Sequence, residues 1–441
     1  MQFSMKESIL RAVFCAAIVF CASARFFDRG VWADQIPSRW AADNMRPIGY
    51  SDLDGRGGAF KMAIRQVNGR WYLYLGHLWH RGWSIVDVTD PANPKYVKFI
   101  PGPPNTWTIQ MDLHGNTMIT ALQNFAPAWG GDPKKPFEEG FLIWDISDPL
   151  NPKQLSHWKT GSTGTHRDGY TGGKYVNAAA NMPGYKGQIL VFIDISDPQN
   201  PKEAGRWWMP GQKQGEPAPP QNISFHGPAI VDGNTAYLGY GYSIVILDVS
   251  DISKPKLVGQ LDLNAFKGVH DVLPIPGRHL LFANSEGISE TCDEALNHAS
   301  LIDIKDPAKP RLISLFPVPV PPKGAPYTDF CDKGGRFGPH NTNLEYHLPD
   351  VQKQGDLVYL TYFNAGLRIF DIQDAHLPRE VGWFIPPTPA KRIGPQPVTK
   401  LVTQTEDVLV DTRGNIYITD KHWGLFVLRY TGKGQPEPTA K

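Results

Sequence analysis

Four histidines lie at equivalent positions of successive repeats: His166, His226, His270 and His340. Each is the third residue of a short segment that opens a predicted strand, in the contexts GTHR, SFHG, GVHD and GPHN. Neutral imidazoles are common ligands of iron, copper and zinc. The chain has only 13 histidines in 441 residues, so four at one register favour a metal site over the alternative, which is ordinary polar packing.

The ligand type narrows the choice of metal. Nitrogen ligation without thiolate suits Fe(II), Cu(II) or Zn(II). Catalytic zinc usually takes three protein ligands and keeps one position open. Four histidines therefore predict one transition-metal ion, Fe(II) or Cu(II), with zinc less favoured.

Acidic residues near these histidines are candidates to orient them or to act as acid or base. A metal-bound histidine commonly donates its second ring N–H to a carboxylate or a carbonyl. Glu406 is the strongest candidate, because it occupies in the last repeat the register that histidine occupies in four others. The further candidates are Asp168, Asp271 and Asp407.

Other residues are expected around the mouth of this site. An aromatic-lined approach, suited to a hydrophobic substrate, is predicted from Trp107, Arg167, Tyr170, Phe225, Phe337 and Trp423. Ordinary packing is the alternative for each of these aromatic residues. Further ligands at the rim are possible at His77, His80 and His422, although a solvated rim is the favoured interpretation for the first two.

The elements that must position these residues are short strands joined by turns. One pattern recurs, a β-branched run followed by Asp, a hydrophobic residue and an Asp-Pro type turn. The copies are SIVDVTDPANP (84–94), LIWDISDPLNP (142–152), VFIDISDPQNP (191–201), VILDVSDISKP (245–255), SLIDIKDPAKP (300–310) and RIFDIQDAHLP (368–378). We interpret their aspartates as scaffold. A degenerate seventh copy is GLFVLRY (424–430).

The repeat length predicts the fold. Each repeat spans roughly 55 residues, which is room for about four strands, and such periods are typical of propeller blades. We therefore predict an all-β chain, a single seven-bladed β-propeller with four-stranded antiparallel blades over residues 50–430. Residues 34–49 are expected to be an N-terminal extension and residues 431–441 a flexible tail.

The recurring VD[VI][ST]DPx[NK]P pattern resembles the LVIVD-repeat β-propeller family, which specifies a fold and says little about function. Four histidines on the axis of a propeller are similar in layout to two known arrangements. One is the iron centre of carotenoid and stilbene cleavage oxygenases, and the other is the proposed copper site of the selenium-binding protein/methanethiol oxidase family. These resemblances imply iron or copper redox chemistry and concern the layout only.

The N-terminus has the pattern of a secretory signal. Lys6 and Arg11 precede an apolar run over residues 12–24, which is short for a membrane span. We predict a signal peptide over residues 1–33, cleaved after Ala24 or Ala33, with an uncleaved anchor as the alternative. The mature protein is then expected to be periplasmic or secreted, without stable membrane insertion. In that oxidising compartment Cys292 and Cys331 are predicted to form a disulfide.

Composition limits the function. With 44 Lys+Arg against 43 Asp+Glu, the chain is not expected to bind nucleic acid through a positive field. We expect a secreted, O₂-using metal-dependent oxidoreductase that acts on a small hydrophobic molecule, phenolic or olefinic. The alternatives are a non-enzymatic binding propeller and a metal-dependent hydrolase or lyase. No protein partner is indicated.

Overall fold

The computed structural model describes residues 34–434 except 219–222, 264–267 and 346. The predicted signal peptide, with both cleavage sites, and residues 435–441 of the predicted tail lie outside the described residues. The described chain is built from short antiparallel strands, which confirms the all-β prediction. Its helices are η1 (Pro127–Trp129) and α1 (Phe330–Lys333). In the described part, no helix is both long and apolar enough to cross a membrane.

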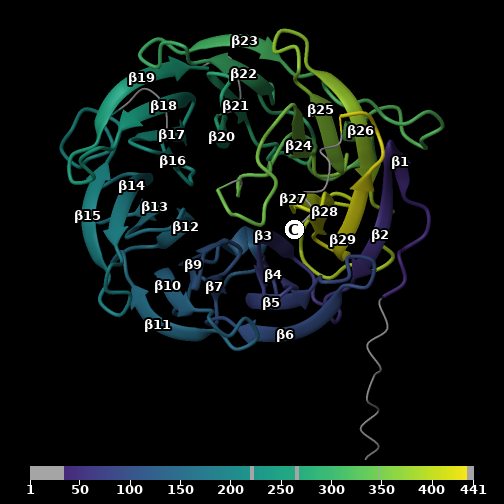
Figure 1. Ribbon diagram of the computed structural model, residues 1–441, viewed down its shortest axis with the longest axis horizontal. Helices are drawn as coiled ribbons and strands as arrows, with labels where there is room; N and C mark the ends of the chain where they lie inside the picture. Colours follow the sequence, from purple (N-terminus) through teal and green to yellow (C-terminus); the bar gives the residue numbers. More distant parts are fainter. Residues whose placement is uncertain (1–33, 219–222, 264–267, 346, 435–441) are drawn as a thin grey trace, which may run out of the picture. The chain divides into compact units, whose positions relative to one another are not determined.

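The sheets follow one another around a ring (Figure 1): five are four-stranded and antiparallel, and one sheet of nine strands, β7 to β15, joins the second and third blades. The first four comprise β3 (Ala59–Val67), β4 (Arg70–His77), β5 (Gly82–Asp87) and β6 (Lys95–Pro101); β8 (Met111–His114), β9 (Thr117–Asn124), β10 (Gly140–Asp145) and β11 (Lys153–Trp158); β12 (Gly164–Gly169), β13 (Tyr175–Asn181), β14 (Gln188–Asp194) and β15 (Lys202–Trp207); and β16 (Ile230–Asp232), β17 (Thr235–Tyr240), β18 (Ser243–Asp248) and β19 (Lys256–Asp262). The short β7 (Thr106–Trp107) pairs with β9, and one residue pair joins β9 to β12.

The remaining blades complete the ring, an arrangement consistent with the seven repeats of the sequence. They comprise β20 (Asp271–Ile275), β21 (Leu280–Asn284), β22 (Ala299–Asp303) and β23 (Arg311–Leu315); β24 (Leu357–Thr361), β25 (Leu367–Asp371), β26 (Arg379–Ile385) and β1 (Ala41–Asp43); and β27 (Thr405–Val410), β28 (Asn415–Asp420), β29 (Gly424–Tyr430) and β2 (Met45–Ser51). In the sixth blade Thr342 bridges to Leu360 on the inner side of β24.

The ring closes through the N-terminal strands. β2 pairs with β29 as the outer strand of the last blade, and β1 pairs with β26 of the blade before it. The sheets therefore begin before residue 50, and part of the expected extension over residues 34–49 belongs to the propeller. Joining N-terminal and C-terminal strands in one sheet leaves fewer unpaired edges.

The recurring aspartates act as scaffold. In each turn the first Asp accepts the N–H two residues on, as Asp194 accepts from Ser196 at 2.8 Å. The second Asp does the same, as Asp197 accepts from Gln199 at 3.0 Å. These contacts hold the backbone in a tight turn at the end of the third strand of a blade.

Five of the six turns pack against a glycine or serine in the outer strand of the preceding blade, whereas the turn after β10 meets Lys98, whose Nζ donates to Leu150 O at 3.0 Å. A Cβ added to Gly259 would lie 2.0 Å from the Pro307 carbonyl oxygen, and one added to Gly205 would lie 2.0 Å from that of Ile252. Where serine stands instead, its hydroxyl bonds the same turn: Ser156 Oγ donates to Pro198 O at 2.6 Å. The small residue therefore sets how closely two blades approach.

Side chains near the axis connect the inner strands of successive blades. A carboxylate or amide oxygen of one blade accepts a backbone N–H of the next. The pairs are Asp112 with Tyr170, Asn177 with Ala229, Asp271 with Thr342, Asn343 with Val410 and Asp407 with Met62, at 2.7 to 3.2 Å. We call these contacts the inter-blade clamps.

The blade contact at Gly259 can be tested by substitution. Gly259→Ala places a methyl group against a backbone oxygen that cannot move without separating two blades. We expect it to lower the free energy of unfolding by about 3 kcal/mol, the upper range for overpacking. Gly355→Ala is the control, because a Cβ there meets nothing within 4 Å. Equal stability of the two variants in urea unfolding would contradict this account of the repeat.

Candidate metal centre

The four predicted histidines come together near the ring axis. Their rings form a row, with centroids 4.7 Å apart from His166 to His226, 4.2 Å from His226 to His270 and 4.9 Å from His270 to His340. His166 lies in β12, His226 and His270 lie shortly before β16 and β20, and His340 lies in the segment that bridges to β24 through Thr342. Segments far apart in the sequence thus place the imidazoles side by side. The shared register seen in the sequence thus becomes a cluster in space.

The Nδ1 atoms of three of these rings have partners within the protein. His166 Nδ1 lies 2.8 Å from Gln123 Oε1, and His270 Nδ1 lies 3.0 Å from Asp271 Oδ1. His340 Nδ1 lies 2.8 Å from the Glu406 carbonyl oxygen. Protons placed on Nδ1 leave the Nε2 lone pairs available for a ligand, which is the usual arrangement of metal-binding histidines.

On the Nε2 side stands a carboxylate that the sequence did not single out. Glu286 Oε2 lies 3.8 Å from His226 Nε2 and 3.7 Å from His270 Nε2, and Glu286 Oε1 lies 3.8 Å from His340 Nε2. Arg336 forms an ion pair with the same carboxylate and donates from Nε to Gly287 O at 2.6 Å. His226, His270 and Glu286 place one ligand atom each within 4.8 Å of one another.

Burial sets the charges of these groups. It lowers the pKa of His166 to about 3 and lowers the pKa of His226 and His340 well below the usual value, so these imidazoles are neutral near pH 7. Burial is the largest single influence on the pKa of Glu286 and raises it, but the charge and hydrogen bond of Arg336, together with His270 and His166, outweigh burial and the net shift is downward. The arrangement is an ionised carboxylate facing neutral imidazoles, which suits a divalent cation.

Two of the four predicted acids contact the histidines. Asp271 adjoins His270, and the Glu406 carboxylate lies 3.4 Å from His340 Nδ1 while it pairs with Lys421 Nζ at 2.6 Å. Asp168 instead accepts from Thr165 Oγ1, and Asp407 pairs with Lys61 and the Met62 N–H. For Asp168 and Asp407 the predicted role beside the histidines therefore has no contact to support it.

A cavity of about 350 Å³ adjoins the histidines. Of the predicted aromatic approach, only Trp107 lines it, with its ring 5.8 Å from that of His166. Two aromatic residues not predicted, Phe60 and Trp129, also line it. The cavity is thus apolar on one side, as expected, but it is built from different residues.

The other predicted pocket residues pack elsewhere. Arg167 is buried beneath the histidines and donates to Asp271 Oδ1 at 2.7 Å. Tyr170 follows the end of β12, where its ring meets His114. Phe225 stacks on Tyr240, Phe337 stacks on Phe330, and Trp423 donates to Pro387 O. None of these five residues lines the cavity, because each side chain packs or hydrogen-bonds against another part of the protein.

The three possible rim ligands are engaged within the protein. His77 is fully buried, with Nε2 2.7 Å from Ser84 Oγ and Nδ1 3.2 Å from Gly57 O. His80 Nδ1 also lies near Gly57 O, at 3.3 Å. His422 accepts the Ile393 N–H at Nδ1, and its Nε2 lies 2.8 Å from Gln396 O. These contacts leave them apart from the four-histidine cluster.

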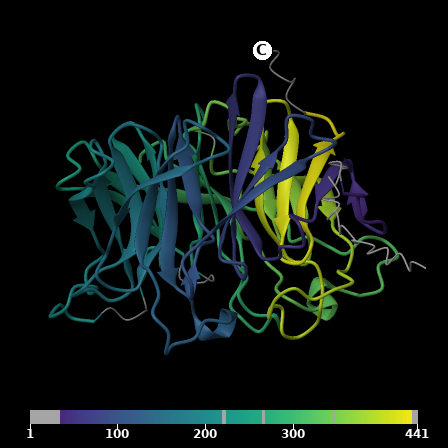
Figure 2. The ribbon, with the colours of Figure 1, turned by 90° about the horizontal axis from the view of Figure 1, so that it is seen from below.

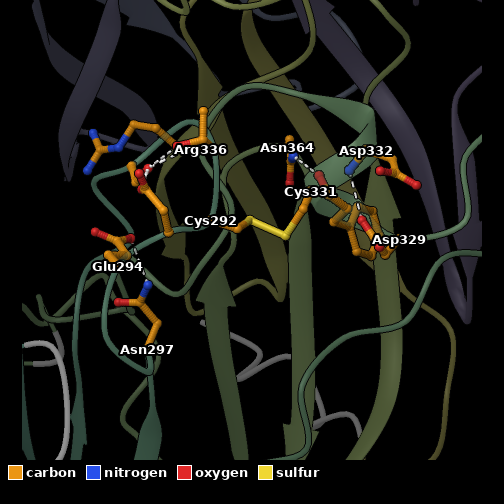
Figure 3. The surroundings of a disulfide bond; sticks show 12 residues. Cys292, Glu294, Asn297, Asp329, Cys331, Asp332, Arg336 and Asn364 are labelled. Atoms are coloured by element: carbon orange, nitrogen blue, oxygen red, sulfur yellow. Dashed lines mark hydrogen bonds between the residues drawn. A yellow bond between two sulfur atoms is a disulfide. The ribbon is translucent and has the colours of Figure 1, made fainter.

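Loops on one side of the ring surround the site. Figure 2 shows η1 and α1 on the same side of the sheets. Cys292 and Cys331 are joined as a disulfide, with Cα atoms 5.9 Å apart, and they link the loop that follows Glu286 to the loop that carries Arg336 (Figure 3). Glu290, from the first of these loops, accepts the N–H groups of Val398 and Thr399.

A second group of potential ligands lies deeper along the axis. Asp112, Glu345 and His347 place one atom each within 4.8 Å of one another. Lys61 pairs with Glu345, and His347 Nε2 lies 3.6 Å from Asp112. Because Asp112 is an inter-blade clamp and the charges are compensated, we assign this group to the scaffold.

Comparisons with known proteins support the fold. Residues 184–208 and 229–262 match the LVIVD repeat, and this match supports a propeller family. No curated protein matches the chain. Many solved structures share its fold, among them the following three, each at a low level of identity. The Cps50 (Swd1) β-propeller domain of Myceliophteria thermophila has a TM-score of 0.53 at 11% identity, covering 88% of this chain and 99% of that one.

The other two solved structures match a similar share of this chain. The periplasmic gluconolactonase PpgL of Pseudomonas aeruginosa has a TM-score of 0.52 at 10% identity, covering 83% of this chain and 97% of its own. A protein from Lactobacillus plantarum has a TM-score of 0.51 at 12% identity, covering 82% and 98%. At such identities the likeness shows the propeller fold alone.

The ion pair between Arg167 and Asp271 can be tested by comparing a single variant with a double variant. Arg167→Met leaves the buried Asp271 carboxylate without its cation, so we expect a loss of about 3–5 kcal/mol in the free energy of unfolding. Arg167→Met/Asp271→Asn should lose less than Arg167→Met alone, because the introduced amide carries no charge and its oxygen can still accept the Thr342 N–H. Urea unfolding measures both. A loss below about 1 kcal/mol for the single variant would show that Asp271 does not depend on Arg167.

Proposed function

We propose that this chain is a metal-dependent oxidoreductase that uses O₂ to oxidise a small hydrophobic molecule. The metal is iron or copper, held by His166, His226, His270 and His340. The observation that carries the proposal is the row of four adjacent imidazoles, with the Glu286 carboxylate beside the Nε2 atoms of His226, His270 and His340.

The donor set fits such an ion. Imidazole nitrogens with one carboxylate suit Fe(II), Cu(II) or Zn(II), and the absence of thiolate disfavours a purely structural site. The His226 side chain is 27% exposed, so the centre can be reached from outside. When bound, iron or copper would supply one-electron chemistry with O₂ that no side chain of the chain supplies.

The protein's own residues perform the supporting work. Asp271, Gln123 and the Glu406 carbonyl fix the orientation of three imidazoles through Nδ1. Arg336 keeps Glu286 ionised and in place beside the histidines, where it can accept a proton from a substrate. Phe60, Trp107 and Trp129 exclude water from one wall of the cavity.

One observation favours a second candidate. Glu286 lies beside the Nε2 atoms of three histidines, where its carboxylate could act as a general base if a metal supplied an activated water, so a metal-dependent hydrolase or lyase is the alternative. This alternative predicts turnover with zinc and without O₂.

We propose a periplasmic or secreted location for the mature protein. The signal-like N-terminus and the disulfide between Cys292 and Cys331 support it, because disulfides persist in oxidising compartments.

Metal content tests the site. We expect the mature protein, purified without chelating resin, to bind about one iron or copper ion per chain. His226→Ala/His270→Ala should lose at least about tenfold in metal affinity, since it removes two adjacent ligands. His80→Ala/His376→Ala is the control, because both residues lie outside the cluster and His376 is 80% exposed. Elemental analysis and circular dichroism measure loading and folding.

Two outcomes would contradict the proposal. A folded wild-type protein that takes up no transition metal on reconstitution would leave a non-enzymatic binding propeller. A zinc-loaded protein that turns over substrate without O₂ would establish the hydrolase or lyase instead.

A further inference from the structure

The cavity beside the histidines has two unlike walls. One is apolar and is formed by Phe60, Leu78, Trp107, Ile109 and Trp129. The other is polar and is formed by Glu286, Glu290, Arg336, Gln396 and the histidines. Such a division orients a ligand, because an apolar body and a polar end must face opposite ways.

The apolar wall is aromatic and firmly supported. Phe60, Leu78 and Ile109 form a buried cluster against which Trp107 and Trp129 pack. The Trp107 and Trp129 rings lie 5.7 Å apart with planes tilted by 41°. The Phe60 ring lies 5.5 Å from His340, so this wall reaches the histidines. Flat faces and a volume of about 350 Å³ suit a planar ring of modest size.

The charged groups of the polar wall are mostly engaged by the protein. Arg336 pairs with Glu286 and donates to Gly287 O. The Glu290 carboxylate accepts the Val398 and Thr399 N–H groups. No cation among the described lining residues is therefore left to pair with a ligand anion.

One oxygen of this wall differs from the rest. Glu286 Oε2 lies 3.8 Å from His226 Nε2 and 3.7 Å from His270 Nε2, beyond hydrogen-bond distance of both. Arg336 pairs with the other oxygen of this carboxylate, Oε1, so Oε2 belongs to an ion-paired carboxylate and is an acceptor without a donor of its own among the described residues. Glu286 Oε2 can therefore accept a hydrogen bond from a ligand donor at the end of the cavity nearest the histidines.

We infer that the ligand of this cavity is a neutral planar aromatic molecule with one hydrogen-bond donor, a hydroxyl or an amine. Its ring lies against Phe60, Trp107 and Trp129, and its donor points at Glu286 Oε2 beside the histidines. Anionic aromatics such as carboxylates are excluded by Glu286 and Glu290. The inference rests on the proposed function in taking the histidine end of the cavity as the reactive end.

Three probes of one shape test the inference. Para-ethylphenol has the ring and the donor, para-ethylanisole lacks the donor, and para-ethylbenzoate carries a negative charge. Binding to the full chain is followed by calorimetry and by quenching of tryptophan fluorescence, with metal removed and with metal restored. In the metal-free protein we expect the phenol to bind at least about tenfold more tightly than the anisole, and the benzoate not to bind.

Two variants test which residues contact the donor and the ring of the bound probe. Glu286→Gln should reduce the preference for phenol over anisole severalfold and allow benzoate to bind. Trp129→Leu should weaken all aromatic probes severalfold, and Trp107→Leu serves if that variant does not fold. Trp208→Leu is the matched control, because Trp208 packs on Tyr185 away from the cavity and should leave binding unchanged.

The outcomes separate this inference from the proposed function. Equal binding of phenol and anisole, or tighter binding of benzoate, would overturn the inference even in a protein that binds metal. Selective phenol binding that is lost in Glu286→Gln would support it even if no iron or copper binds, and the metal analysis would then overturn the proposed function alone.

Discussion

The inter-blade clamps are the contacts on which the rest of the structure depends. Each clamp is a buried carboxylate or amide that accepts a backbone N–H from the next inner strand. Inner strands crowd together at the axis, so their unpaired N–H groups would otherwise be buried without a partner, at a cost in free energy. The clamps satisfy these groups at five junctions between blades, and they help to hold the inner strands that carry the histidines at their mutual distances.

Buried carboxylates need positively charged partners, and these ion pairs also surround the candidate metal centre. Arg167 pairs with Asp271, Lys61 with Glu345 and Asp407, and Lys421 with Glu406. Asp271 thus has two roles, because it clamps Thr342 and also adjoins His270 Nδ1. Burial that makes these pairs costly also lowers the pKa of His166, His226 and His340 and keeps them neutral. Scaffold and candidate centre therefore share one electrostatic environment.

The loops contribute charged residues of the site that no strand carries. Glu286 and Arg336 come from different blades, and the pair forms only because the two loops meet over the ring axis. The disulfide between Cys292 and Cys331 joins these loops. Function in propellers is commonly found in such loops, since they are free to vary while the sheets stay constant. Here they bring a charged oxygen to the imidazoles and complete the polar wall of the cavity.

The sequence by itself determined the propeller and the clustering of the histidines. Repeats with one strand pattern must adopt one blade geometry, so His166, His226, His270 and His340 share one place relative to the axis. Tertiary structure alone decided the rest. Glu286 lies two residues after the second strand of its blade, a place where no other blade carries an acid, so the repeat pattern did not point to it. Phe225 and Tyr170 stand close to the histidine register, as Trp107 does, yet a side chain's direction depends on local bulges and strand ends, which a residue pattern does not specify.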